Sequence, residues 1–84
     1  MERYRQVFKR SVAKDLRPIP NRGVARILDR LKALSENPRP PGCEKLSGQE
    51  RYRIRQGSFR IIYEIRDKIL LVVVVKIAHR KEAY

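Results

Sequence analysis

The sequence predicts a small α+β protein in which two N-terminal helices pack on one face of an antiparallel sheet of about four strands. Two patterns predict this class. Between residues 11 and 34 the apolar residues recur at helical spacing, whereas from residue 51 onward they alternate with charged residues, as in half-buried strands. The expected element order is therefore β-α-α-β-β-β. The 84 residues suffice for one compact domain, which we assign to residues 1–84.

The first third of the chain predicts a strand and two helices. Residues 4–9 alternate as a short strand does, and residues 11–16 carry Val12 and Leu16 at helical spacing before two prolines end the helix. In the second helix Asn21 is a suitable N-cap, and the helix should end before Asn37, which precedes a proline. Its apolar face is formed by Val24, Ile27, Leu28, Leu31 and Leu34.

A hairpin is predicted after residue 51, because the hydrophobic period changes to two. A two-residue turn at positions 57 and 58, in which the glycine supplies a positive φ, sets its register. With this turn Arg55 opposes Arg60, and Arg53 lies on the same face. The opposite, apolar face is formed by Tyr52, Ile54, Ile61 and Tyr63. Residues 69–75 are apolar on both faces, as expected of a central strand covered on both sides.

The charge balance indicates a polyanionic partner. The chain has 21 Lys and Arg against 9 Asp and Glu, a formal net charge of +12. Nucleic acid is the leading candidate, ahead of an anionic membrane surface or an acidic protein, and a merely solvated basic surface is the alternative. The single cysteine, Cys43, suits a reducing compartment, and no segment has the length of a membrane helix. We expect a cytoplasmic protein that does not bind membranes.

Three arginines on one face of the hairpin favour an anionic ligand, because like charges on opposed strands destabilise the pair. Guanidinium groups bind phosphate oxygens in pairs and stay protonated. Arg53, Arg55 and Arg60 could therefore hold a scissile phosphate and stabilise the charge that grows in its transition state. The alternative is three solvated arginines on an open sheet face.

The C-terminal segment supplies two further candidates. His79 is the only histidine, and its ordinary pKa suits proton transfer near neutral pH, although a lone histidine is more often structural. Tyr84 could stack on an unpaired base or orient a phosphate, or it could simply be a frayed terminal residue. The sequence has no glycine-rich phosphate loop and no metal-ligand spacing, so we predict neither a cofactor nor a metal.

Three passages together resemble the RelE branch of the RelE/ParE toxin superfamily. They are residues 45–48 (Lys-Leu-Ser-Gly), the hairpin of residues 52–63, and His79-Arg80 with Tyr84 after the apolar strand. The resemblance implies a RelE-like fold. It also implies a metal-free endoribonuclease that cleaves messenger RNA in the ribosomal A site, using the RNA's own 2′-hydroxyl against the adjacent phosphate, and thereby inhibits translation.

The resemblance also assigns roles to the candidate residues. Arg53 and Arg55 match positions that hold basic residues, often lysines, and Arg60 matches the arginine that contacts the scissile phosphate. Arg80 matches the basic residue near the leaving group, and Tyr84 the terminal tyrosine. Because arginine is a poorer general base than lysine, His79 or Glu44 becomes a candidate base, unless catalysis relies mainly on electrostatic stabilisation.

The partners implied by the resemblance are a cognate acidic antitoxin, messenger RNA and the ribosome, with promoter DNA bound only through the antitoxin complex. An acidic, partly disordered segment that folds on binding would suit a surface of +12 charge. Two other functions stay open. One is a ParE-like, non-enzymatic inhibitor of gyrase, and the other is a basic RNA-binding module without catalysis.

Overall fold

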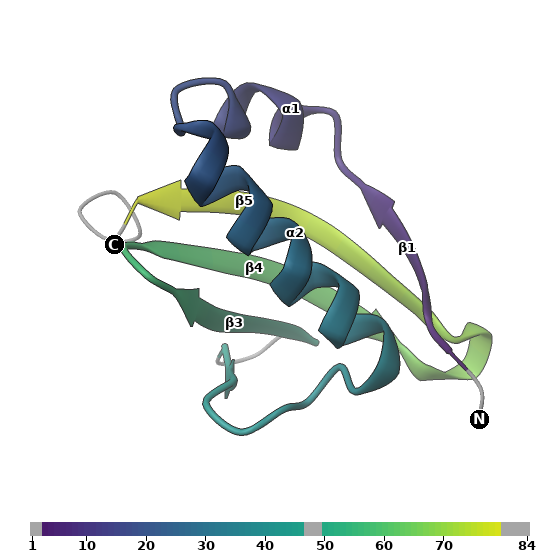
Figure 1. The fold of residues 1–84 in the computed structure, drawn as a ribbon. Helices are drawn as coiled ribbons and strands as arrows, with labels where there is room; N and C mark the ends of the chain where they lie inside the picture. The colour runs from purple at the N-terminus through teal and green to yellow at the C-terminus, as the bar shows by residue number, and fades with distance from the viewer. Residues whose placement is uncertain (1–2, 47–49, 80–84) are drawn as a thin grey trace.

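The computed structural model describes residues 3–46 and 50–79, and Figure 1 shows their arrangement. Helices α1 (Ser11–Leu16) and α2 (Asn21–Glu36) pack on the same face of one sheet. The described strands are β1 (Arg5–Phe8), β2 (Glu44–Lys45), β3 (Arg51–Gln56), β4 (Phe59–Arg66) and β5 (Leu71–His79), and the short 3-10 helix η1 (Asp67–Ile69) joins the last two. The predicted α+β class is confirmed. In this part of the chain no helix is long and apolar enough to cross a membrane.

Helix α2 forms the centre of the core because its apolar stripe meets the sheet. Ile27, Leu31 and Leu34 are almost completely buried, whereas Leu28 is 49% exposed and lies outside the stripe. The predicted cap is wrong by one residue. Pro20 occupies the N-cap position with an extended backbone, and Asn21 is the first residue of the helix, so no side chain caps this end.

The hairpin of β3 and β4 has the predicted register. Arg55 pairs with Arg60, Arg53 pairs with Ile62, and Gly57 has a positive φ of 60° in the turn. The predicted apolar face is confirmed, since Tyr52, Ile54, Ile61 and Tyr63 are all buried in the core beneath the helices. The face that carries the three arginines is therefore the one turned away from the helices.

The sheet differs from the prediction at its edges. Within the described residues it has five strands in the order β1-β5-β4-β3-β2, and β1 runs parallel to β5, so the sheet is mixed. The parallel pair is possible because both helices and three strands separate β1 from β5 along the chain, which gives the length that a crossover needs. The two-residue strand β2 adds the opposite edge.

Strand β5 is covered by helices on one face only, not on both as its apolar run predicts. Val72 and Val74 are fully buried on the helix side, while Val73 is only partly buried. Beyond the end of β1, helix α1 covers the free edge of β5. The Oδ2 atom of Asp15 accepts a hydrogen bond from the backbone N–H of Ile77 at 3.1 Å, which pairs an edge donor that β1 does not reach.

A cluster centred on Arg39 fixes the proline-rich loop to the sheet. The guanidinium of Arg39 donates to both oxygens of Asp67, at 3.1 and 2.9 Å, and lies over the ring of Tyr52. Tyr4 donates a further hydrogen bond to Asp67 at 2.7 Å. These bonds lower the pKa of Asp67 from 3.8 to about 2, with the Arg39 bond as the largest cause.

We expect this cluster to make stability depend on pH. A carboxylate with a depressed folded-state pKa stabilises the fold above its unfolded pKa of 3.8, and this contribution is lost as the pH falls toward about 2. The variant Asp67→Asn should therefore unfold at lower urea concentration than the wild type at pH 6, and the two should converge near pH 2. A difference between their urea midpoints that is the same at both pH values would contradict this role.

Tyr63 makes a buried hydrogen bond to the same proline-rich loop. Its hydroxyl donates to the carbonyl oxygen of Pro38 at 2.7 Å, and burial raises the pKa of this phenol. The variant Tyr63→Phe leaves a buried carbonyl without a partner, so we expect it to lower the unfolding free energy by about 1–3 kcal/mol. Urea unfolding at pH 7 measures this, with Tyr4→Phe as the control because Tyr4 bonds an exposed carboxylate. Equal stabilities of wild type and Tyr63→Phe would refute the expectation.

Candidate functional site

The arginine face is the surface that carries Arg53, Arg55 and Arg60, on the side of the sheet without helices. The antiparallel register of β3 and β4 brings these three side chains together. Each strand places alternate residues on opposite faces, so the same alternation that buries Tyr52 and Ile61 turns the arginines outward. The predicted grouping of the three arginines on one face is confirmed.

The outer arginines on this side of the sheet, Arg51, Arg53 and Arg66, form ion pairs with two carboxylates. The Nε atom of Arg53 lies 3.4 Å from Oε1 of Glu44, which β2 places opposite it. Arg51 and Arg66 bond the two oxygens of Glu64 at 2.7 and 3.1 Å, and these bonds, that of Arg51 most strongly, lower the pKa of Glu64. Glu64 is therefore ionised, and its one negative charge offsets half of the charge of these two arginines.

The central pair of the arginine face is different. Arg55 and Arg60 oppose each other across the hairpin, and neither forms an ion pair with a carboxylate of residues 3–46 or 50–79. Arg55 is exposed. The Nη1 atom of Arg60 is buried and has no hydrogen-bond partner among the described residues. Because an unpaired buried donor and two opposed like charges both cost free energy, this pair is suited to bind an anion.

His79 lies on the other face of the sheet. It pairs in register with Phe59, and the two rings meet edge to face with their centroids 5.4 Å apart. Both rings line a pocket of about 240 Å³ that Lys14 and Asp15 of α1 also line. The structure therefore does not bring His79 together with the arginines. The other two candidates, Arg80 and Tyr84, lie outside the described residues, and their roles stay predictions.

Glu44 is the carboxylate that the fold adds to the arginine face beside Arg53. Its side chain is 66% exposed, and its Oε1 atom lies 3.4 Å from Nε of Arg53. Within residues 3–46 and 50–79 no group of three or more His, Cys, Asp or Glu side chains could hold a metal ion. The site as described thus offers guanidinium groups for anion binding and one accessible carboxylate for proton transfer.

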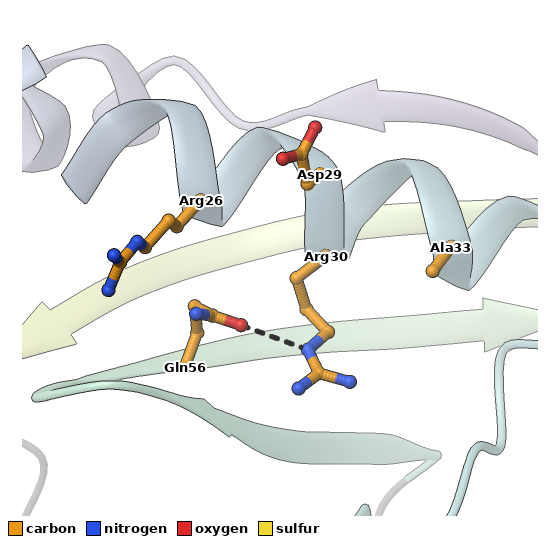
Figure 2. Close-up of a pocket in the computed structure, with 5 residues that line it drawn as sticks. All are labelled: Arg26, Asp29, Arg30, Ala33 and Gln56. Atoms are coloured by element: carbon orange, nitrogen blue, oxygen red, sulfur yellow. Dashed lines mark hydrogen bonds between the residues drawn. The ribbon is translucent and has the colours of Figure 1, made fainter. Parts of the chain in front are cut away.

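Sequence reasoning missed a second basic site on the helix side. Arg26, Asp29, Arg30, Ala33 and Gln56 line a pocket of about 270 Å³ between α2 and the end of β3. Figure 2 shows Arg26 and Arg30 extending from the same side of α2 with Gln56 between them, and Oε1 of Gln56 accepts a hydrogen bond from Nε of Arg30 at 3.1 Å. The four-residue spacing of the two arginines on α2 was the signal for it.

A family model matches nearly the whole chain. It is described as the ParE toxin of the type II toxin–antitoxin system parDE, and it matches residues 7–84. Among curated proteins, the RelE1 protein of Methanocaldococcus jannaschii is 30% identical over 83 residues, which cover 94% of this chain and 91% of that protein.

Solved structures share the fold. The RelBE2 toxin–antitoxin complex of Mycobacterium tuberculosis contains a chain that superposes with a TM-score of 0.81 at 26% identity, over 93% of this chain and 99% of that one. A chain of the RelE–RelB complex of Pyrococcus horikoshii gives 0.80 at 27% identity, over 95% and 98%. The isolated RelE toxin of E. coli gives 0.78 at 23% identity, over 90% and 83%.

Proposed function

The chain belongs to the RelE/ParE toxin superfamily, and from this premise we propose that it is a metal-free endoribonuclease that cleaves messenger RNA in the ribosomal A site. It is a toxin of the RelBE type. In the proposed reaction the 2′-hydroxyl of one nucleotide attacks the adjacent phosphate, and the bond from phosphorus to the 5′-oxygen of the next nucleotide breaks. The products are a 2′,3′-cyclic phosphate and a 5′-hydroxyl. A messenger substrate places the protein in the cytoplasm.

The observation that supports this proposal is the pair of opposed arginines without carboxylate partners. Arg55 and Arg60 face the same surface, and a buried Nη1 atom of Arg60 has no partner among the described residues. A phosphate bound there supplies the acceptor oxygens that both guanidinium groups require. As attack proceeds, negative charge grows on the non-bridging oxygens, and the fixed arginines stabilise it without reorganising.

We assign the proton acceptor to Glu44. The 2′-hydroxyl must lose its proton as it attacks, and Glu44 lies on the arginine face with a side chain that is 66% exposed. Glu64 shares this face, but both of its oxygens are bonded to arginines. His79 lines a pocket on the opposite side. The leaving 5′-oxygen needs a proton in turn, and Arg80 is the group expected near it.

A cognate antitoxin is the natural protein partner. The structures that share this fold include toxins solved together with RelB antitoxins. An acidic antitoxin segment that covers the arginine face would neutralise Arg55 and Arg60 and block the phosphate site. Binding to promoter DNA would then occur only through the antitoxin complex, because the toxin's own basic face is covered.

A second candidate function is inhibition of gyrase without catalysis. It is favoured by one finding, the description of the matching family model as a ParE toxin. A gyrase inhibitor of this kind acts through protein contacts and has no need of a phosphate site or a proton acceptor. A DNA supercoiling assay with purified gyrase separates this function from the proposed one.

The proposed activity is tested by adding the purified protein to a reconstituted translation extract and mapping the 5′ ends of the messenger by primer extension. We expect new ends at defined codon positions that depend on translation, and normal supercoiling by gyrase. An intact messenger together with inhibited supercoiling would replace the proposal by the gyrase function. An intact messenger that the protein merely binds would indicate an RNA-binding module.

A further inference from the structure

Helix α2 carries a row of arginines away from the arginine face. Arg22, Arg26 and Arg30 follow one another at four-residue intervals, so they lie along one side of the helix with about 6 Å of rise between neighbours. We call these three residues the α2 arginine row. None of them pairs with a carboxylate within the part of the chain that the structure describes. Like charges at this spacing destabilise a helix unless an anion offsets them.

Two members of the α2 arginine row, Arg26 and Arg30, border a groove that extends to the hairpin. Arg26 and Arg30 line the pocket of about 270 Å³ beside Gln56, while Asp29 points away from both guanidinium groups (Figure 2). The bond from Nε of Arg30 to Oε1 of Gln56 fixes the orientation of that guanidinium, whose two terminal nitrogens point away from Gln56 (Figure 2). Among the described residues that line this pocket, Asp29 is the only acidic one. The groove is therefore strongly cationic.

The groove and the arginine face meet at the end of the hairpin. Gln56 follows Arg55 directly on β3, and because alternate residues of a strand face opposite sides, Gln56 turns toward α2 while Arg55 turns toward the arginine face. The two side chains therefore come from neighbouring residues at the end of the strand and project onto opposite faces of the sheet. A flexible polyanion that passes around the hairpin end can thus contact both surfaces.

The chemistry of the groove favours a nucleic-acid backbone over a protein helix. A docked helix needs apolar anchors in its groove, and within residues 3–46 and 50–79 Ala33 is the only apolar side chain that lines this pocket. Regularly spaced arginines suit a regularly spaced series of phosphates instead. We propose that the α2 arginine row binds the backbone of the same messenger strand whose scissile phosphate lies at the arginine face. This inference rests on the proposed function and extends the site to flanking nucleotides.

The test measures how RNA affinity depends on salt. The parent protein is Arg60→Ala, which is used to prevent cleavage, and the test variant adds Arg26→Gln and Arg30→Gln. A matched control adds Lys32→Gln and Lys68→Gln, which removes the same charge from two exposed lysines outside the groove. Fluorescence anisotropy with labelled single-stranded RNAs of 12 and 4 nucleotides gives the affinity at several salt concentrations, and thermal unfolding checks that all three proteins fold.

With the longer RNA, the slope of log affinity against log salt should be shallower by about 1.4 in the test variant, because each lost phosphate contact on a single strand changes it by about 0.7. The control should keep the parent slope. With the shorter RNA, which has fewer phosphates to contact the two surfaces at once, the difference in slope between test variant and control should be smaller. Equal slopes of test variant and control on the longer RNA would overturn the inference.

Two further outcomes would assign the row to another ligand and also overturn the inference. One is a loss of affinity in the test variant that is seen only with intact ribosomes and not with the labelled RNAs, which would make ribosomal RNA the ligand. The other is an unchanged RNA slope with weaker binding of a polyglutamate peptide, which would indicate a protein surface. The proposed function is judged separately. If the wild type cuts no messenger but the slopes differ as expected, the ribonuclease proposal fails and RNA binding by the row stands.

Discussion

Replacing Arg60 with alanine is expected to slow messenger cleavage by about 10²–10³-fold, the usual loss when one preorganised donor to the developing negative charge is removed. We expect a loss of this size because Arg60 opposes Arg55, lacks a carboxylate partner among the described residues and is partly buried. The fold should be kept, since Arg60 is not part of the hydrophobic core. The rate is measured under single-turnover conditions on programmed ribosomes, so that product release does not affect it.

Arg66→Ala is the matched control for this substitution. Arg66 is an exposed arginine of the same strand, and it already has a carboxylate partner, Glu64 at 3.1 Å. Its loss removes the same formal charge and should change the cleavage rate much less than Arg60→Ala. Equal losses in the two variants would show that only net charge matters, and an unchanged rate in Arg60→Ala would place the phosphate site elsewhere.

Glu44→Gln is the second substitution for which we expect a large effect, a loss of about 10²–10⁴-fold in the cleavage rate, as is typical when a general base is removed. The amide keeps the size of the side chain but cannot accept the proton of the 2′-hydroxyl. The comparison variant is His79→Asn, which alters the other candidate base on the opposite side of the sheet. Single-turnover rates of both variants are measured at pH 7 with the messenger used for the wild type.

The base assignment depends on the contrast between these two variants. It predicts that His79→Asn retains most of the wild-type rate while Glu44→Gln does not. If His79→Asn loses activity and Glu44→Gln keeps it, Glu44 is not the base. If both variants keep the wild-type rate, catalysis depends on electrostatic stabilisation by the arginines alone.

The hairpin and helix α2 could be predicted from the sequence because each has one apolar and one polar face. In the hairpin, the alternation and the glycine turn together allow a single register, and the register found is the expected one. In α2, the spacing of Ile27, Leu31 and Leu34 identifies the buried stripe. Because β3 and β4 carry all three arginines, the composition of the arginine face followed from the same pattern.

The face on which His79 lies could not be predicted. The strand before it is a run of apolar residues, so no alternation shows which side chains turn toward the helices. The pairing of β4 with β5 also shifts between Ile62 and Tyr63, whose partners are Lys76 and Val74. Such an irregularity inserts one extra residue and reverses the expected side for everything beyond it.

Which of the arginines have a carboxylate partner also could not be predicted from the sequence. Arg53, Arg55 and Arg60 look equivalent along the chain, but a two-residue strand brings Glu44 opposite Arg53 and leaves the other two without a carboxylate among the described residues. A strand of that length has too little pattern to be recognised. The parallel pairing of β1 with β5 likewise depends on how the intervening helices direct the chain back to the sheet, which no local pattern specifies.

The central claim is that the arginine face promotes attack of the RNA's own 2′-hydroxyl on a bound phosphate. The most direct measurement uses a messenger with a single 2′-O-methyl nucleotide immediately before a mapped cleavage site. We predict that cleavage at this bond disappears, that cleavage at other mapped sites persists, and that the fragments begin with a 5′-hydroxyl. Cleavage of the methylated bond, or fragments that begin with a 5′-phosphate, would contradict the claim.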